Sequence, residues 1–271
     1  MATRSPLLNV MVRAAEKAAR KLKRDFGEVE NLQVSRKGPA DFVSAADQRA
    51  ERVLREELQK ARPEFGFLME EGGSIEGSDP RGSRFIVDPL DGTTNFLHGL
   101  PHFAISIAAE QDDGLIAGIV YDPIKEELFL AEKGNGAFLN DRRIRVSART
   151  RLDSSVIATG APFKGHGDRP VFLREIDVIM AETAGIRRFG SAALDLAYVA
   201  AGRYEGFWER DLNYWDTAAG VVLVREAGGF VGEIEKRPFT DKSKSILAAT
   251  TSLEGPLQRL LNRANKQGPG R

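Results

Sequence analysis

The sequence predicts a mixed α/β protein of layered helices and sheets, with its functional site in the crevice between two lobes. Three observations support this prediction. Two amphipathic helical patterns open the chain, short apolar runs separated by turn signals follow, and strand and helix patterns alternate beyond about residue 150. The length of 271 residues suits one domain of two packed lobes, about 1–150 and about 151–262.

The first two elements are predicted to be helices. Ser5-Pro6 is a helix start, and apolar residues then recur at helical spacing, namely Leu7, Val10, Met11, Ala14, Ala18 and Leu22. A second helix is predicted from about Ser44 to Arg62, with the apolar stripe Ala46, Ala50, Val53, Leu54 and Leu58. The segment 34–47, between the two helices, is expected to be a hairpin or loop with a mobile basic tip.

Strand patterns fill the rest of the first lobe. A short strand in residues 64–71 ends in two glutamates, residues 72–83 form a loop, and a strand follows at 84–89. Two hairpins are predicted where turn signals separate apolar runs, the first joining 103–110 to 115–122 and the second joining 127–133 to 136–140. The second lobe should contain strands at 155–160 and 245–250, helices near 169–184, 190–202 and 215–229, and a frayed polar tail at 262–271.

Composition excludes several classes of function. Lys plus Arg and Asp plus Glu both number 39, which argues against direct nucleic-acid binding. The chain has no cysteine, so disulfides, thiol nucleophiles and cysteine-ligated metals are impossible. No apolar run is long enough for a membrane span, and we expect a cytoplasmic protein. His98 and His102 are four residues apart, but Gly99 and Pro101 interrupt any helix between them, which favours a hard, oxygen-bound cation over zinc.

The stretch "FIVDPLDGTTNF", residues 85–96, carries more oxygen ligands than a turn needs. Asp88 leaves the predicted strand at its end, Pro89 fixes the turn, and Asp91 follows three residues later and is able to face the same point. Taken alone, an Asp-Gly pair is more often a turn than a site. Two carboxylates at one strand end are also what a divalent cation requires.

The residues after Asp91 point to a phosphate. Gly92 lets the backbone approach a ligand closely, and Thr93 and Thr94 suit a helix start whose free N–H groups would bind an anion. Carboxylates for cations beside a helix start for an anion are the components of metal-assisted phosphate chemistry.

Two further acidic positions would complete such a site. Glu70 and Glu71 end a strand, where a solvated loop edge is the alternative interpretation. Asp216 lies at a predicted helix start in "WDTAAG", where N-capping is the usual role of an aspartate. Glu70, Asp88, Asp91 and Asp216 together would supply the convergent carboxylates that two or more Mg²⁺ ions need.

These residues carry a resemblance to a known family. "DPLDGTTNFLHGLP" and "WDTAAGVVLVREAGG" resemble the two signature motifs of the inositol monophosphatase family, and "GNGAFLN" and "RRFGSAALDLAYVAAGRYEGFWE" are similar to its bacterial SuhB-type branch. The resemblance extends from about Pro6 to Leu260. It implies the layered α/β/α/β/α sandwich shared with fructose-1,6-bisphosphatases, and a lithium-sensitive, Mg²⁺-dependent phosphatase with two or three ions.

The resemblance also implies roles for individual residues. The positions that match the family's metal ligands are Glu70, Asp88, the Leu90 carbonyl, Asp91 and Asp216. Thr93 matches the residue that orients the attacking water together with Glu70, and the backbone of Gly92 and Thr93 would hold the phosphate. Contacts with substrate hydroxyls are implied for Gly190, Ala192 and Glu209, and a weaker third metal for the region of Lys37 and Asp47.

The resemblance leaves the substrate and a second role open. Relatives hydrolyse inositol phosphates, histidinol phosphate, fructose bisphosphate or phosphoadenosine phosphate, and the "GSAALDLAYVAAGR" helix favours inositol-1-phosphate. The segment around Glu209 differs from many relatives. A function of another class is that of a binding partner, since SuhB-type relatives associate with the transcription and ribosome-assembly machinery. The family is commonly dimeric, so we expect a homodimer.

Overall fold

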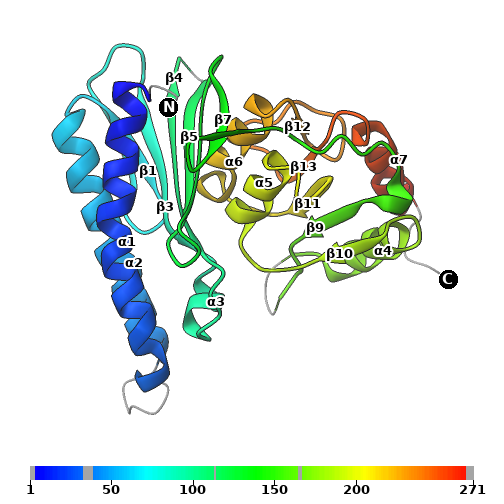
Figure 1. The fold of residues 1–271 in the computed structure, drawn as a ribbon, viewed down its shortest axis with the longest axis horizontal. Helices are drawn as coiled ribbons and strands as arrows, with labels where there is room; N and C mark the ends of the chain where they lie inside the picture. Colours follow the sequence, from blue (N-terminus) through cyan, green and yellow to red (C-terminus); the bar gives the residue numbers. More distant parts are fainter. Residues whose placement is uncertain (1–3, 33–38, 113, 164–166, 267–271) are drawn as a thin grey trace.

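The computed structural model describes residues 4–32, 39–112, 114–163 and 167–266, and it confirms the layered sandwich (Figure 1). Five layers follow one another through the described part of the molecule. They are a helix pair, an eight-stranded sheet, a second helix pair, a five-stranded sheet and a third helix pair. Each layer buries apolar side chains against the next, as helices and sheets with apolar faces must.

The first layer consists of α1 (Pro6–Leu32) and α2 (Pro39–Ala61), which pack side by side on the first sheet. Most of the predicted α1 stripe and all of the α2 stripe are buried, while Leu7 and Val10 are half-buried. The predicted start of α2 near residue 44 is wrong, because the helix begins at Pro39. Proline suits a first helical turn, where no N–H partner is required. The predicted loop is therefore helical from residue 39 on, and residues 33–38 lie outside the described residues.

The first sheet has the strand order β2-β1-β3-β4-β5-β6-β7-β8. Its strands are β1 (Gly66–Met69), β2 (Gly73–Ile75), β3 (Arg84–Asp91), β4 (Ala104–Gln111), β5 (Gly114–Asp122), β6 (Glu127–Glu132), β7 (Gly136–Leu139) and β8 (Arg142–Ile144). Both predicted hairpins are confirmed, as β4 with β5 and β6 with β7. The edge strands β2 and β8 were not predicted. Each has three mostly exposed residues, too few to show an alternating pattern.

The second sheet has the strand order β10-β9-β11-β13-β12. Its strands are β9 (Val156–Thr159), β10 (Gly185–Arg187), β11 (Gly206–Arg210), β12 (Phe230–Gly232) and β13 (Ser245–Ala249), and a single 3₁₀ turn (Leu152–Ser154) precedes them. The helices of this half are α4 (Arg169–Met180), α5 (Ala192–Ala200), α6 (Tyr214–Glu226) and α7 (Glu254–Lys266). The prediction missed β10, β11, β12 and α7. The prediction of a frayed tail at 262–271 is wrong for residues 262–266, because α7 continues through them.

Helices α5 and α6 form the central layer, between the two sheets, while α4 and α7 cover the far face of the second sheet. Every residue of α6 from Thr217 to Val224 is buried, which is the pattern of a helix enclosed on all sides. Burying each valine or leucine side chain stabilises the fold by about 1.5–3 kcal/mol. The central helices therefore hold the two sheets together, and the loops at their ends lie where both halves meet.

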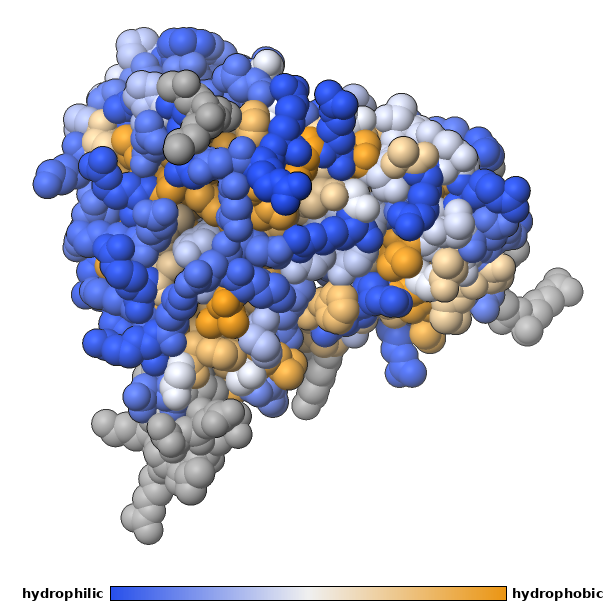
Figure 2. Space-filling model, in the orientation of Figure 1, coloured by the Kyte–Doolittle hydropathy of each residue, from blue (hydrophilic) through white to orange (hydrophobic). Residues whose placement is uncertain are grey.

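The face of the molecule drawn in Figure 2 is largely polar. Hydrophilic side chains cover most of the face drawn in Figure 2, with smaller hydrophobic areas between them. Among the described residues, no helix is both long and apolar enough to cross a membrane.

Candidate active site

The first two acidic residues of the site come from neighbouring strands. β1 and β3 pair in parallel with Met69 beside Val87, so Glu70 and Asp88 follow at the same edge of the sheet. The backbone N–H of Glu70 donates to the carbonyl of Val87 at 3.2 Å. The side chains of Glu70 and Asp88 are also hydrogen-bonded to each other. The parallel register therefore brings together two acids that are 18 positions apart in the sequence.

Beyond Asp88 the chain leaves the regular ladder. Asp88 is opposite Ser106 of β4, but the next paired residue is Asp91, and the register shifts between the two. Oδ1 of Asp88 accepts a hydrogen bond of 2.9 Å from the backbone N–H of Leu90, which closes a tight turn. This irregularity is what moves Asp91 out of the strand pattern and into the site.

Asp91 reaches across to the central helices. Its Oδ2 accepts hydrogen bonds from the Ser191 hydroxyl, at 2.5 Å, and from the backbone N–H of Ala193, at 2.7 Å. Ser191 is the N-cap residue of α5. The carboxylate of Asp91 therefore joins the end of the first sheet to the start of a helix about 100 residues later.

Asp216 comes from the first turn of α6. The N-cap of this helix is Asn213, and the backbone N–H of Asn213 donates to Oδ2 of Asp216 at 2.7 Å. Asp216 thus takes part in capping from the third helical position, in a capping box, and not as the N-cap itself. The arrangement fixes one carboxylate oxygen on the helix.

The surroundings of the four carboxyl groups disfavour their charged forms. Burial raises the pKa of Asp88 well above its usual range, and the charges of Asp91, Glu70 and Asp216 raise it further. Burial is also the main cause of the raised pKa of Glu70, Asp91 and Asp216. The hydrogen bond from Ser191 opposes the shift at Asp91. Positive charge placed among these groups would relieve their repulsion.

The ligand atoms that these residues offer suit a hard divalent cation. They are carboxylate oxygens and the carbonyl oxygen of Leu90, to which the Thr93 hydroxyl donates at 3.0 Å. Within the described ranges, no three acidic or histidine side chains are already arranged as a complete metal-binding set. The assignment of a metal to this cluster is therefore a proposal, made on the donor chemistry and the raised pKa values.

A cavity of about 580 Å³ opens beside the cluster. Its volume lies within the range of small-molecule sites, about 300–1,000 Å³. Eight of the predicted site residues line this one cavity, namely Glu70, Asp91, Gly92, Thr93, Gly190, Ala192, Glu209 and Asp216. They come from both halves of the chain and lie around one cavity although the sequence spreads them over 147 positions, from 70 to 216, while the predicted ligands Asp88 and Leu90 are not among its lining residues.

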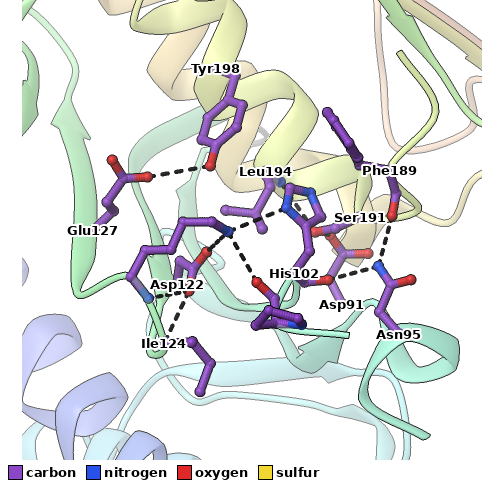
Figure 3. A network of polar contacts seen from close by, with 12 residues as sticks. Asp91, Asn95, His102, Asp122, Ile124, Glu127, Phe189, Ser191, Leu194 and Tyr198 are labelled. Atoms are coloured by element: carbon purple, nitrogen blue, oxygen red, sulfur yellow. Dashed lines mark hydrogen bonds and ion pairs between the residues drawn. The ribbon is translucent and has the colours of Figure 1, made fainter. Parts of the chain in front are cut away.

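The segment after Asp91 forms α3 (Thr93–Leu97), which begins at the predicted threonine. Gly92 precedes it with φ +99°, in the left-handed region that favours glycine. Asn95 in this helix was not predicted to act in the site. Its side-chain amide donates at 2.7 Å to the carbonyls of both His102 and Phe189, as Figure 3 shows. Asn95 therefore ties α3 to the segment that leads into Ser191.

His102 belongs to the polar network drawn in Figure 3. Its Nδ1 lies 3.3 Å from Nζ of Lys125, which also donates to Asp122 at 2.6 Å. Burial, and secondly the charge of Lys125, lowers the pKa of His102 to about 4. The histidine is therefore neutral at physiological pH, and its ring packs 5.1 Å from that of Phe189, measured between centroids.

Glu209 reaches the cavity from β11 in the second sheet. Burial, and then the charges of Asp91 and Asp216, raises the pKa of Glu209 to about 8. Glu209 is thus close to the acidic cluster but lies on a different sheet from Glu70 and Asp88. Its carboxyl group suits contact with the part of a substrate that lies away from the phosphate.

The proposed third-metal region is only partly described. Lys37 lies outside the described residues. Asp47 is buried in α2, and one of its oxygens has no hydrogen-bond partner among the described residues. Burial, and then the charges of Glu70, Glu71 and Glu51, raises the pKa of Asp47 to about 8. Asp47 thus adds a further carboxyl group on the side of Glu70 that faces α2.

Comparison with known proteins agrees with this geometry. The sequence model of the inositol monophosphatase family matches residues 3–267. The inositol-1-monophosphatase of Rhizobium meliloti is 56% identical over 260 residues, which are 96% of this chain and 97% of that protein. The Nus factor SuhB of Escherichia coli K12 is 45% identical over 228 residues, 84% of this chain and 85% of that one.

A solved structure shows the same fold. The native crystal structure of the extragenic suppressor protein suhB from Bartonella henselae superposes with a TM-score of 0.89 at 58% identity, over 96% of this chain and 99% of that one. The fold and the acidic cavity thus define a phosphatase of the layered-sandwich class. The chain belongs to the inositol monophosphatase family.

Proposed function

We propose that the protein is a Mg²⁺-dependent phosphomonoesterase that hydrolyses inositol-1-phosphate or a similar small polyol phosphate. The observation that carries this proposal is the cavity itself. Eight of the residues that line it, from both halves of the chain, are predicted site residues, and the carboxyl groups beside it have pKa values raised by burial and mutual repulsion. Perturbed acids that converge on one cavity are typical of a catalytic site.

The residues that would hold two magnesium ions are Glu70, Asp88, the Leu90 carbonyl, Asp91 and Asp216. Glu70 and Asp47 would adjoin a third, weaker site. When bound, the cation supplies positive charge for the phosphate oxygens and lowers the pKa of water at the site. A phosphate needs this charge because the cavity is otherwise acidic.

Thr93 is suited to orient the attacking water. Its hydroxyl donates its one proton to the Leu90 carbonyl at 3.0 Å, so the oxygen is left to accept a hydrogen bond. Glu70 offers a second acceptor from the neighbouring strand end. Two acceptors fix both the place and the direction of a water molecule, and we propose that this water attacks phosphorus directly. The backbone N–H groups of Gly92 and Thr93 would hold the phosphate oxygens.

The rest of the substrate would contact the second half of the chain. Glu209, Gly190 and Ala192 line the cavity away from the strand ends that carry Glu70 and Asp88. A carboxyl group and backbone that lines the cavity suit the hydroxyls of a polyol. The relative from Rhizobium meliloti, at 56% identity, bears the name inositol-1-monophosphatase, which supports inositol-1-phosphate as the first substrate to test.

The test is a phosphate-release assay on a panel of small phosphomonoesters, with and without Mg²⁺. The panel contains inositol-1-phosphate, histidinol phosphate, fructose-1,6-bisphosphate and phosphoadenosine phosphate. We expect turnover to require Mg²⁺, to be highest on inositol-1-phosphate and to be inhibited by lithium. Preference for another member would replace the substrate, and equal turnover in a chelator would contradict the metal.

A second candidate function is supported by the relatives named Nus factor SuhB, which are 45% identical in Pseudomonas aeruginosa and Escherichia coli. We propose as the alternative that the chain, expected to be a homodimer, is a binding partner of the transcription or ribosome-assembly machinery. Size-exclusion chromatography with light scattering gives the oligomeric state. Negligible turnover on the whole panel, together with a stable complex with RNA polymerase or its elongation factors, would favour this role.

A further inference from the structure

Gly160 and the carboxylate of Glu209 lie against each other at the edge of the cavity. β9 and β11 run parallel with Thr159 opposite Trp208, so the next residues of the two strands, Gly160 and Glu209, are neighbours. A Cβ atom placed on Gly160 would lie 1.7 Å from Oε1 of Glu209 and 2.3 Å from Oε2. The carboxylate therefore occupies the space that any side chain at position 160 would need.

The backbone at Gly160 is held in place independently of Glu209. The Thr159 hydroxyl is buried and donates to the carbonyl of Trp208 at 2.8 Å, and it lies 2.9 Å from the carbonyl of Gly160. The backbone of Gly160 also hydrogen-bonds to the Glu209 carboxylate. The Thr159 hydroxyl thus fixes the end of β9, and the backbone of Gly160 supports the Glu209 carboxylate.

Backbone conformation does not explain the glycine. Gly160 is not one of the described glycines with positive φ, so an alanine there adopts the same backbone without strain. The nearest obstacle to a larger residue is the Glu209 carboxylate, because its three atoms are the nearest neighbours of the added Cβ. Since these atoms end a flexible side chain, the collision is relieved by moving the carboxylate and not the strands.

We propose that Gly160 is a specificity-determining residue, which sets the place of the Glu209 carboxylate and thereby selects phosphomonoesters whose alcohol carries a hydroxyl at that place. This inference rests on the proposed function, in which Glu209 contacts a substrate hydroxyl. Gly160 itself touches no reacting atom and acts through Glu209. A polar site discriminates because an analogue without the hydroxyl leaves the half-buried carboxyl group without that partner.

The kinetic test uses Gly160→Ala with two substrates, inositol-1-phosphate and phenyl phosphate, which lacks hydroxyls on its ring. We expect kcat/KM on inositol-1-phosphate to fall at least about tenfold more than on phenyl phosphate. Glu209→Ala should show the same selective loss, and the double variant should be no worse than Glu209→Ala. Equal losses on both substrates, or a further loss in the double variant, would overturn the proposal.

Thermal melting provides a readout that does not require turnover. Gly160→Ala should lower Tm in the wild-type chain and lower it clearly less in the Glu209→Ala background, where the nearest obstacle is removed. Gly185→Ala is the control, because its added Cβ would meet only the end of the Arg187 side chain, at 3.3 Å, in the same sheet. The control should leave the substrate preference unchanged.

The two measurements separate this inference from the proposed function. If the wild-type protein hydrolyses neither substrate nor any member of the phosphomonoester panel, the proposed function fails and the specificity role fails with it, while the melting experiment still decides whether Gly160 positions Glu209. If turnover is normal but Gly160→Ala lowers Tm equally in both backgrounds, the two residues are not coupled and the inference is wrong.

Discussion

The Ser191 hydroxyl donates a hydrogen bond of 2.5 Å to Oδ2 of Asp91, although 100 positions separate the two residues in the sequence. Ser191 also caps α5 by accepting from the backbone N–H of Leu194. One hydroxyl group therefore orients a carboxylate of the first sheet and fixes the start of a central helix. The proposed metal ligand Asp91 is thus positioned by the layer that lies between the sheets.

Replacing Ser191 by alanine should weaken the binding of Mg²⁺ more than it weakens the binding of substrate. The hydroxyl holds Asp91 in place and lowers its pKa, so its loss should raise the Mg²⁺ concentration for half-maximal activity by about 10–100-fold. Titration of activity with Mg²⁺ measures this effect. Ser191→Thr keeps the hydroxyl and should remain near wild type. An unchanged Mg²⁺ requirement in the alanine variant would show that the contact is only structural.

Asp216→Asn should lower kcat by at least about 100-fold, because the substitution removes a charged ligand without changing the size of the side chain. Circular dichroism should show a folded protein, since asparagine can still accept the hydrogen bond from Asn213. Asp153→Asn is the matched control, because Asp153 is an exposed acid paired with Arg151 on the surface. Full activity in Asp216→Asn would exclude Asp216 from the metal site.

Thr93→Ala should lower kcat more than it raises KM, since the change removes the orientation of water and leaves the contacts with substrate in place. Thr93→Ser keeps the hydroxyl and should recover most of the rate. Hydrolysis of a chiral thiophosphate substrate in isotopically labelled water should invert the configuration at phosphorus, as one direct displacement does. Retention would imply a covalent phosphoenzyme and would contradict the mechanism.

The metal-free protein should become less stable as the pH rises. A carboxyl group whose folded pKa is raised stabilises the protein fully below its unfolded pKa, near 4, and loses this contribution as the pH approaches the folded pKa. That value is about 8 for both Glu209 and Asp47. Tm measured with a chelator should therefore fall between about pH 5 and about pH 8.

Mg²⁺ should oppose this trend. Protons and cations compete for the same carboxylates, so the increase in Tm caused by Mg²⁺ should be larger at about pH 8 than at about pH 6. Differential scanning fluorimetry at both pH values measures the difference. An increase that is equal at both pH values, or larger at the lower one, would argue that the cation binds away from the acidic cluster.

The sequence predicted those features that depend on local pattern. Residue spacing or turn chemistry within a short stretch of sequence predicts each of three features, namely the stripe of α2, the two hairpins and the turn at Asp88. The edge strands were missed because three residues carry no periodicity. The start of α2 was missed because a proline at that position is as compatible with a loop as with the first turn of a helix.

The supporting residues of the site could not be predicted in the same way. Ser191 acts on a residue 100 positions away, and Asn95 on the carbonyl of a residue 94 positions away. Gly160 is explained only by the register of two strands. Each of these contacts depends on how the layers pack. A short stretch of consecutive residues does not contain that information. A serine before an apolar helix signals a cap, and that was the only local sign of Ser191.

The central position of α6 has a consequence for synthesis of the chain on the ribosome. The last strand of the first sheet ends at Ile144, and α6 begins at Tyr214, 70 residues later (214 − 144). At about 5–20 residues per second, synthesis of these residues takes roughly 4–14 s, and during this time the inner face of that sheet lacks the helix that covers it. During this interval a nascent chain exposes Ile86, Val120 and Phe129, all of which are buried at the end. We therefore expect the nascent chain to need shielding of these apolar strand residues until α6 has been synthesised.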